Sequence, residues 1–370
     1  MEVVLSVTRS GMYTALADCR NYCTTVPQTF YRKFFEQDFS STSAFFQPPL
    51  DTIRNEFTFP VEDAIGVMVS AACLLLLRFT LHHTLFKSAG HSMKLREEDV
   101  KKVPESLWSV VFYSSVFSYM CYLLHFTERH NYLTDMHSWY TPMTDLARNE
   151  LWWVYIVELG YYLSAVINDG YLNTEKVFTD KVMMVIHHAA TIGLIVFSYS
   201  LDFLPAGVVV LYCHDACDIW LDSAKIFNYL GRRGFGLTKL YEAISNGLFV
   251  TFVISWVYFR LYLFGVKTLY GTGYVYYTDV DPPHLYLTFN LLLHVLLVLH
   301  YIWFALILKV VIKVIQGEDK EDIREKEIRE RKMKEKRLKN PIRRKSSLAQ
   351  VYLDNTLATD APDGDDKKIL

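Results

Sequence analysis

Residues 182–222 read VMMVIHHAATIGLIVFSYSLDFLPAGVVVLYCHDACDIWLD. This stretch contains two apolar runs, roughly 182–199 and 204–221, and each is long enough to cross a hydrocarbon core of about 30 Å as an α-helix. Only residues 200–203 separate the runs, so we expect the two helices to form a tight antiparallel hairpin. Pro205 fits the opening turn of the second helix, where its missing N–H costs little.

Other apolar segments of similar length lie on both sides of this hairpin. Together with the hairpin they predict an all-α, polytopic membrane protein with about seven transmembrane helices. The predicted spans outside the hairpin are approximately 61–86, 106–126, 151–167, 244–264 and 285–315.

The composition agrees with this fold class and excludes several others. The chain is 51% hydrophobic and 15% aromatic, and its apolar residues are gathered in blocks, as in a membrane protein. A net charge of −2 gives the chain no overall positive potential that would attract nucleic acid. The Cys count is 6 with no C-x-x-C pair, which indicates neither a zinc site nor a disulfide framework. No cleavable signal peptide is predicted, so the internal spans are expected to drive insertion.

The basic residues between the spans predict the orientation. We expect residues 1–60 to be lumenal, the short loop 88–104 to be cytosolic, and the charged tail 316–370 to be cytosolic. The chain ends Lys367-Lys368-Ile369-Leu370, which resembles a dilysine retrieval signal of the endoplasmic reticulum. The basic residues on the predicted cytosolic side are Lys87, Lys94, Arg96, Lys101, Lys102, Lys176, Lys181, Lys225, Arg232, Arg233 and Lys239.

The candidate functional residues are the polar side chains inside the hairpin, because ionisable groups are costly within a membrane. The aspartates of the second helix share one face, at positions i, i+3 and i+7. Since the first helix enters from the cytosol and the second returns to it, imidazoles and carboxylates are expected to meet at one depth. The residues concerned are His187, His188, Thr191, His214, Asp215, Asp218 and Asp222.

Other polar residues in the spans have a simpler interpretation. A single intramembrane histidine is often a hydrogen-bonded packing residue, and we interpret His82, His83, His125, His294 and His300 in that way. Cys213 and Cys217 are interpreted as small packing residues.

These residues carry a resemblance to a known family. The stretch from Val182 to His188 with Thr191, followed by His214-Asp215 and Asp218, resembles the longevity-assurance motif of the ceramide synthases, which are TLC-domain membrane proteins. Residues 102–108, KVPESLW, are similar to the way that domain opens. The chain looks like the subtype without a homeobox-like segment, and Asp222 stands where the family usually has Glu.

The resemblance implies a fold and a reaction. It implies that the last six helices are bundled around a lipid tunnel, with 61–87 as a separate first transmembrane helix and 105–315 as the catalytic TLC domain. The implied reaction is N-acylation of a sphingoid base by fatty acyl-CoA to give (dihydro)ceramide. The implied partners are fatty acyl-CoA as co-substrate, the sphingoid base and membrane lipid, with no cofactor, metal or nucleic acid. A homodimer or heterodimer is compatible with it, and the location is the endoplasmic reticulum membrane.

The roles of the site residues follow from the same resemblance and from the chemistry of amines. His187, His188, Asp215 and Asp218 are expected to be catalytic, with His214, Asp222 and Thr191 supporting them. One scheme uses a histidine only as general base, and the other uses His187 as a nucleophile that carries the acyl group. Acyl-chain length is expected to depend on the lumenal connection at roughly 266–284.

Three alternatives compete with this interpretation. The first is a non-enzymatic TLC-domain protein that senses lipid or associates with the translocon. The second is a membrane di-iron hydroxylase or desaturase, which needs H-x-x-H-H boxes that the chain lacks. The third is an aspartate-rich, magnesium-dependent prenyl-transfer site, which needs two aspartate motifs where this chain has one.

Overall fold

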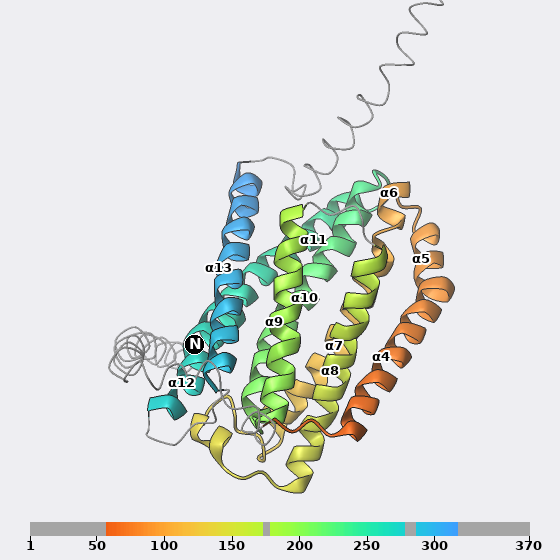
Figure 1. The fold of residues 1–370 in the computed structure, drawn as a ribbon. Helices are drawn as coiled ribbons and strands as arrows, with labels where there is room; N and C mark the ends of the chain where they lie inside the picture. The colour runs from red at the N-terminus through yellow and green to blue at the C-terminus, as the bar shows by residue number, and fades with distance from the viewer. Residues whose placement is uncertain (1–56, 173–177, 278–285, 317–370) are drawn as a thin grey trace, which may run out of the picture. The chain divides into compact units, whose positions relative to one another are not determined.

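The computed structural model describes residues 57–172, 178–277 and 286–316, and every regular element in these ranges is helical (Figure 1). This confirms the predicted all-α fold class. The elements are α4 (Val61–Leu81), the π-helix η1 (His82–Phe86), α5 (Lys87–Ser92), α6 (Glu97–Val100), α7 (Val103–Phe126), the 3₁₀-helix η2 (Met136–Tyr140), α8 (Asp145–Leu172), α9 (Phe178–Ser200), α10 (Leu204–Arg232), α11 (Thr238–Ser255), the π-helix η3 (Trp256–Thr268), α12 (Leu269–Tyr277) and α13 (Tyr286–Ile315).

The described residues fall into two compact units. The first takes the described residues up to 172 and those from 182 to 307, and the second takes 178–181 and 308–316. The first unit contains the helix bundle in which the candidate site residues lie.

The chain is a multi-pass membrane protein. Within the described residues, 6 helical stretches are long and apolar enough to cross a membrane. They correspond to the predicted spans with one exception, and several extend beyond the predicted ends. The stretches are Val61–Ser92, Val103–Phe126, Val182–Ser200, Leu204–Arg232, Thr238–Gly273 and Thr288–Ile315.

The exception is the predicted span 151–167, which lies within α8. This helix has 28 residues and is therefore about 42 Å long, enough to cross a hydrocarbon core. Its tyrosines, its tryptophans and Glu158 keep it out of the apolar set. Most of its middle, including Tyr155, Glu158 and Tyr162, is buried among other helices. A helix covered by neighbouring helices does not need a uniformly apolar surface. A criterion based on hydropathy therefore underestimates the ability of such a helix to span a membrane.

The predicted hairpin is present and its turn is tight. α9 ends at Ser200 and α10 begins at Leu204, with proline in the first turn of α10. The Phe203 N–H donates to the Ser198 carbonyl at 2.7 Å, and Asp202 has a φ of 62°, a left-handed conformation that aspartate tolerates. Arg148 Nη2 donates to both Asp202 carboxylate oxygens, at 2.6 and 2.7 Å, and links α8 to this turn.

Two predicted ends differ from the structure by more than the others. α10 continues to Arg232, beyond the predicted end at residue 221. The predicted span 244–264 continues through η3 and α12 to Tyr277, so the first part of the predicted chain-length connection, 266–277, is helical. Several parts of the chain lie outside the described residues: residues 278–285, the predicted lumenal segment up to residue 56, the tail from 317, and the predicted Lys367-Lys368 signal within that tail.

Close packing joins α8, α9 and α10 near the hairpin turn. Lipid tails are as apolar as the side chains, so membrane helices associate through close packing and interhelical hydrogen bonds. Gly207 on α10 leaves room for the Tyr155 hydroxyl, which donates to the Leu204 carbonyl at 3.1 Å and lies 2.9 Å from Ser198 Oγ. Ser198 Oγ donates to the Ile195 carbonyl at 3.1 Å. A larger residue at position 207 would therefore disrupt the contact among three helices.

We predict that Gly207→Ala destabilises the bundle by about 1–3 kcal/mol, the usual cost of overpacking. Its Cβ would overlap Tyr155 Oη and lie 2.7 Å from Ser198 Oγ. The matched control is Gly247→Ala, whose Cβ meets nothing within 4 Å and which removes the entropic cost of a helical glycine. Thermal unfolding in detergent measures both. Equal melting temperatures for the two variants would contradict the prediction.

A charged cluster holds the connection between α7 and α8. Arg129 Nη2 donates to Glu150 Oε1 at 2.6 Å, and Nε2 of the fully buried His130 lies 2.8 Å from Glu150 Oε2. The hydrogen bond from Arg129, with a further one from His130, lowers the pKa of Glu150 below its ordinary value of 4.5. Ionised Glu150 therefore stabilises the fold above that pH, and the contribution is lost as the pH falls through the lowered pKa.

We predict that Glu150→Gln lowers the melting temperature at pH 7 and that the difference from wild type disappears as the pH falls below about 4. The reason is that protonated Glu150 and glutamine are nearly equivalent partners for Arg129. Thermal unfolding across pH 3–7 measures the difference. Glu128→Gln, at an exposed neighbouring carboxylate, is the control, and a pH-independent effect of Glu150→Gln would contradict the assignment.

Candidate functional site

The hairpin brings histidines of two helices together. His187 of α9 and His214 of α10 have nearly parallel rings, with centroids 6.4 Å apart and planes inclined by 25°. Both side chains are buried. This arrangement follows from the short turn, which places positions equally far from it on α9 and α10 at the same depth.

The hydrogen bonds of His214 determine which of its nitrogens carries the proton. Nδ1 lies 2.6 Å from the Val210 carbonyl, which only accepts, so Nδ1 is the protonated nitrogen. Nε2 of the neutral ring is then an acceptor, and it lies 3.0 Å from Nε2 of His300 on α13. His300 therefore donates to His214 and orients it. We interpreted His300 as a hydrogen-bonded packing residue, and the structure adds that its partner is a site histidine.

His187 has a different environment. The Trp303 ring meets it edge-on, at 5.1 Å between centroids. Its Nδ1 is buried and has no hydrogen-bond partner among the described residues. A buried nitrogen without a partner is uncommon, and in this position it is available to a substrate.

His188 and Thr191 of α9 have different surroundings. The half-buried His188 faces Tyr162 of α8, with ring centroids 6.1 Å apart. The two adjacent histidines therefore point toward different helices, as the 100° step of an α-helix requires. Thr191 is on the His187 side, and its buried hydroxyl has no hydrogen-bond partner among the described residues.

Asp218 is bound by an arginine and not by a histidine. Arg260 of η3 is buried, and its Nη2 donates to Asp218 Oδ2 at 2.9 Å and to the His214 carbonyl at 2.8 Å. In this structure the hydrogen-bond partner of Asp218 is therefore Arg260. The planar guanidinium makes a charge-assisted bond, and its face lies over the Trp256 ring at 4.4 Å.

The other two aspartates have separate partners. Asp215 is fully buried and faces Glu158 of α8. Asp222 accepts a hydrogen bond from Lys225 Nζ at 2.9 Å, one turn further along α10. The three aspartates that share one face of the helix thus belong to three different contacts.

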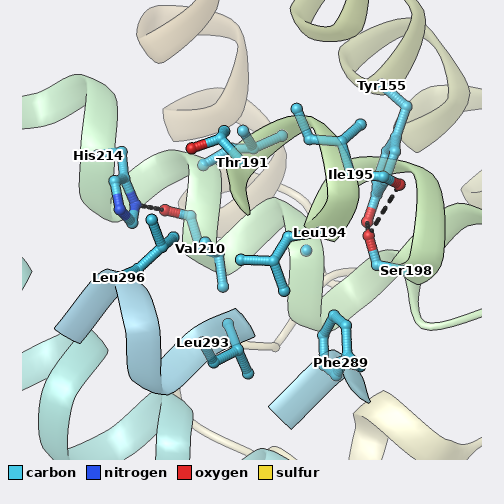
Figure 2. A pocket seen from close by; sticks show the side chains of 12 residues that line it. Tyr155, Thr191, Leu194, Ile195, Ser198, Val210, His214, Phe289, Leu293 and Leu296 are labelled. Atoms are coloured by element: carbon cyan, nitrogen blue, oxygen red, sulfur yellow. Dashed lines mark hydrogen bonds between the residues drawn. The ribbon is translucent and has the colours of Figure 1, made fainter. Parts of the chain in front are cut away.

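A small cavity lies beside His214, on the side of the hairpin turn. Figure 2 shows His214 and Thr191 at one end and Tyr155, Ser198 and Phe289 at the other. Its walls between these ends are aliphatic, and its volume is about 10 Å³. This space is far too small for an acyl chain. The lipid tunnel therefore stays a prediction. The aliphatic lining residues are Leu194, Ile195, Val210, Leu211, Leu293 and Leu296.

Sequence reasoning missed Glu158 and Arg260, although a signal for both was present. Glu158 is the one charged residue in the predicted span 151–167, and Arg260 is the one charged residue in the predicted span 244–264. A lone charge inside an apolar span is costly and marks a functional or paired residue. Within the described residues, no group of three His, Cys, Asp or Glu side chains has an arrangement that would hold a metal ion.

Comparison with known proteins agrees with this geometry. Residues 102–309 match the TLC domain family. The chain is 32% identical over 254 residues to ceramide synthase 1 of Homo sapiens, covering 67% of this chain and 71% of that protein. It is 32% identical over 231 residues to ceramide synthase 4 of Homo sapiens (62% and 55%) and 30% identical over 247 residues to ceramide synthase LOH1 of Arabidopsis thaliana (62% and 74%). The chain therefore belongs to the TLC-domain family and, within it, to the ceramide synthases.

Proposed function

We propose that this protein transfers the acyl group of a fatty acyl-CoA to the amine of a sphingoid base, giving (dihydro)ceramide and free CoA. The observation that carries the proposal is the pairing of His187 with His214 at the head of an aliphatic cavity. Imidazole is a nucleophile and a base near neutral pH, and the aliphatic side chains that line the cavity beside His214 are chemically compatible with a fatty acyl chain. The relatives named ceramide synthases support the same reaction.

The acyl group is carried by His187. The neutral imidazole attacks the thioester carbonyl, the C–S bond breaks, and the imidazole proton passes to the departing sulfur to give the free thiol of CoA. The amine then attacks the acyl-imidazole, an amide bond forms, and one amine proton restores the imidazole. Two long-chain substrates must share one narrow apolar space. With a covalent intermediate they can use it one after the other, which favours this order. In the competing scheme the amine attacks the thioester directly and His187 accepts only a proton.

The surrounding residues position the two histidines. His300 and the Val210 carbonyl hold His214 in one tautomer, so that its ring presents a fixed face to His187. Arg260 holds Asp218 and the backbone of α10 beside the site. The unpartnered Thr191 hydroxyl is available to a polar group of either substrate.

The proposal includes a location and an orientation. We place the enzyme in the endoplasmic reticulum membrane with a lumenal N-terminus and a cytosolic tail, because the basic connections lie on one side. Acyl-CoA then approaches from the cytosol, where Lys225 and Arg232 are close to the end of α10. Lys225 is paired with Asp222 and Arg232 with Asp99, so contact with CoA phosphates would require these cations to exchange partners.

We predict that purified protein incubated with stearoyl-CoA alone gains one acyl mass at His187, and that sphinganine removes it. His187→Ala should lose at least about 10²-fold in acyl transfer, the usual effect of removing a nucleophile or base. Intact-protein mass spectrometry with peptide mapping measures the adduct.

The matched control is His294→Ala, because His294 is an exposed span histidine that bonds the Asn290 carbonyl on its own helix. It should keep the adduct and the activity. Full turnover of the wild type with no adduct would leave His187 as a base only. No transfer to sphinganine by the wild type would overturn the proposed reaction and favour a non-enzymatic TLC-domain protein.

We predict that replacing Lys367 and Lys368 with serine lets the protein leave the endoplasmic reticulum for the Golgi, because a receptor would no longer recognise the C-terminus. Microscopy of the tagged variant with markers of both compartments measures this. Serine replacement of Lys334 and Lys336, two lysines of the tail far from its end, is the control. Unchanged endoplasmic reticulum localisation of the first variant would contradict the signal.

A further inference from the structure

A buried pair of carboxyl groups lies beside the histidines. Glu158 of α8 and Asp215 of α10 are both 0% exposed, and the two carboxyl groups are neighbours that interact electrostatically. None of their four carboxyl oxygens has a hydrogen-bond partner among the described residues. Buried acidic groups are normally compensated by a cation or by several donors. The packing of the helices alone does not explain this pair.

The cations nearest to the pair are already engaged. Arg260 binds Asp218 and the His214 carbonyl, and Lys225 binds Asp222. Two neighbouring carboxylates repel each other, so once one of them ionises the other retains its proton, and a cation at the pair meets one negative charge. The titratable and charged groups that face it are Tyr113 of α7, Tyr161 and Tyr162 of α8, Asp218 of α10 and Arg260 of η3.

The pair is adjacent to the histidines on both sides. Asp215 follows His214, whose ring stacks on His187. On the other side, Tyr162 interacts electrostatically with Glu158 and Asp215. Its ring faces that of His188, with 6.1 Å between the ring centroids. A cationic group of a substrate placed at the pair would therefore be close to the residues that handle the acyl group.

We propose that the Glu158–Asp215 pair binds the ammonium group of the long-chain amine substrate and accepts its first proton. The inference rests on the proposed N-acylation and adds to it a binding site for the second substrate. One negative charge, set in an apolar interior, is complementary to one primary ammonium group. Neutral long-chain alcohols lack that charge and are excluded by the same site.

The proton balance of the reaction requires such a group. An amine of ordinary basicity enters as R–NH₃⁺ near neutral pH, and its nitrogen loses two protons on becoming an amide. One proton returns to the His187 imidazole when the acyl-imidazole is cleaved. The other must leave before attack, because a nitrogen without a lone pair is not a nucleophile. In this assignment it passes to the carboxyl pair, which becomes doubly protonated and neutral and later releases the proton to water.

The test compares wild type with Glu158→Gln in kcat/KM for sphinganine, at saturating stearoyl-CoA, from pH 6 to 9. Without the pair, only the free amine in solution reacts. Below the pKa of the substrate amine, the ratio of the variant's kcat/KM to the wild-type value should therefore increase about tenfold for each unit by which the pH is raised. Glu158→Asp retains a carboxylate and should recover most of the wild-type profile. Acylation of Glu158→Gln by stearoyl-CoA alone should be retained.

Three outcomes would overturn the inference. One is a variant with a constant deficit at every pH, which indicates a merely structural role. Another is unchanged kcat/KM. The third is that Glu158→Gln and Asp215→Asn, which should behave alike, both fail to fold in detergent while Glu158→Asp folds. A wild type that transfers no acyl group to sphinganine at any pH would instead contradict the proposed function, so the two failures are distinguishable.

Discussion

Inside an apolar helix bundle, a polar or charged side chain must find its partner on another helix, because neither lipid tails nor aliphatic side chains supply one. In this protein that requirement decides which helices meet near the histidines. Each contact contains one residue of α10 and one residue from a different helix, so that α10 is linked to α8, η3 and α13. Two are hydrogen bonds, Arg260–Asp218 and His300–His214, and the third is the electrostatic neighbourhood of the carboxyl groups of Glu158 and Asp215.

The same requirement explains why α10 is the most covered of the span helices. The share of its apolar window buried inside the molecule is 78%, against 11% for Val61–Ser92 and 17% for Thr288–Ile315. A helix with several ionisable residues on one face cannot present that face to lipid, whereas the first and last spans can. Gly207 then lets Tyr155 approach α10 closely enough to bond its backbone. Burial of the polar helix and close packing are thus two consequences of one sequence pattern.

Low polarity around the histidines has chemical consequences for the proposed reaction. Water would hydrolyse an acyl-imidazole, so a site closed by Trp303 and by aliphatic residues protects such an intermediate. The low dielectric also makes each engaged charge more effective, since opposite charges attract more strongly there than in water. Arg260 with Asp218 and the unmatched Glu158–Asp215 pair are therefore expected to act on substrates through charge rather than through many contacts.

The sequence by itself determined the class of the protein and the main elements of the site. Apolar run lengths indicated a polytopic all-α protein, and the short connection at 200–203 predicted the hairpin that brings His187 beside His214. These features depend on local geometry, which spacing along one chain describes well.

The tertiary structure decided which side chains are partners. The partner of Asp218 is Arg260, which lies in a π-helix 42 residues later in the chain and binds the carboxylate. His300 looked like an isolated histidine because its partner lies 86 residues earlier, and Glu158 sits in a helix too rich in tyrosine and tryptophan to count among the apolar spans. The physical reason is that a buried polar group pairs with whatever the packing of other helices brings within about 3 Å, and that distance depends on the packing of the whole bundle rather than on position along the chain.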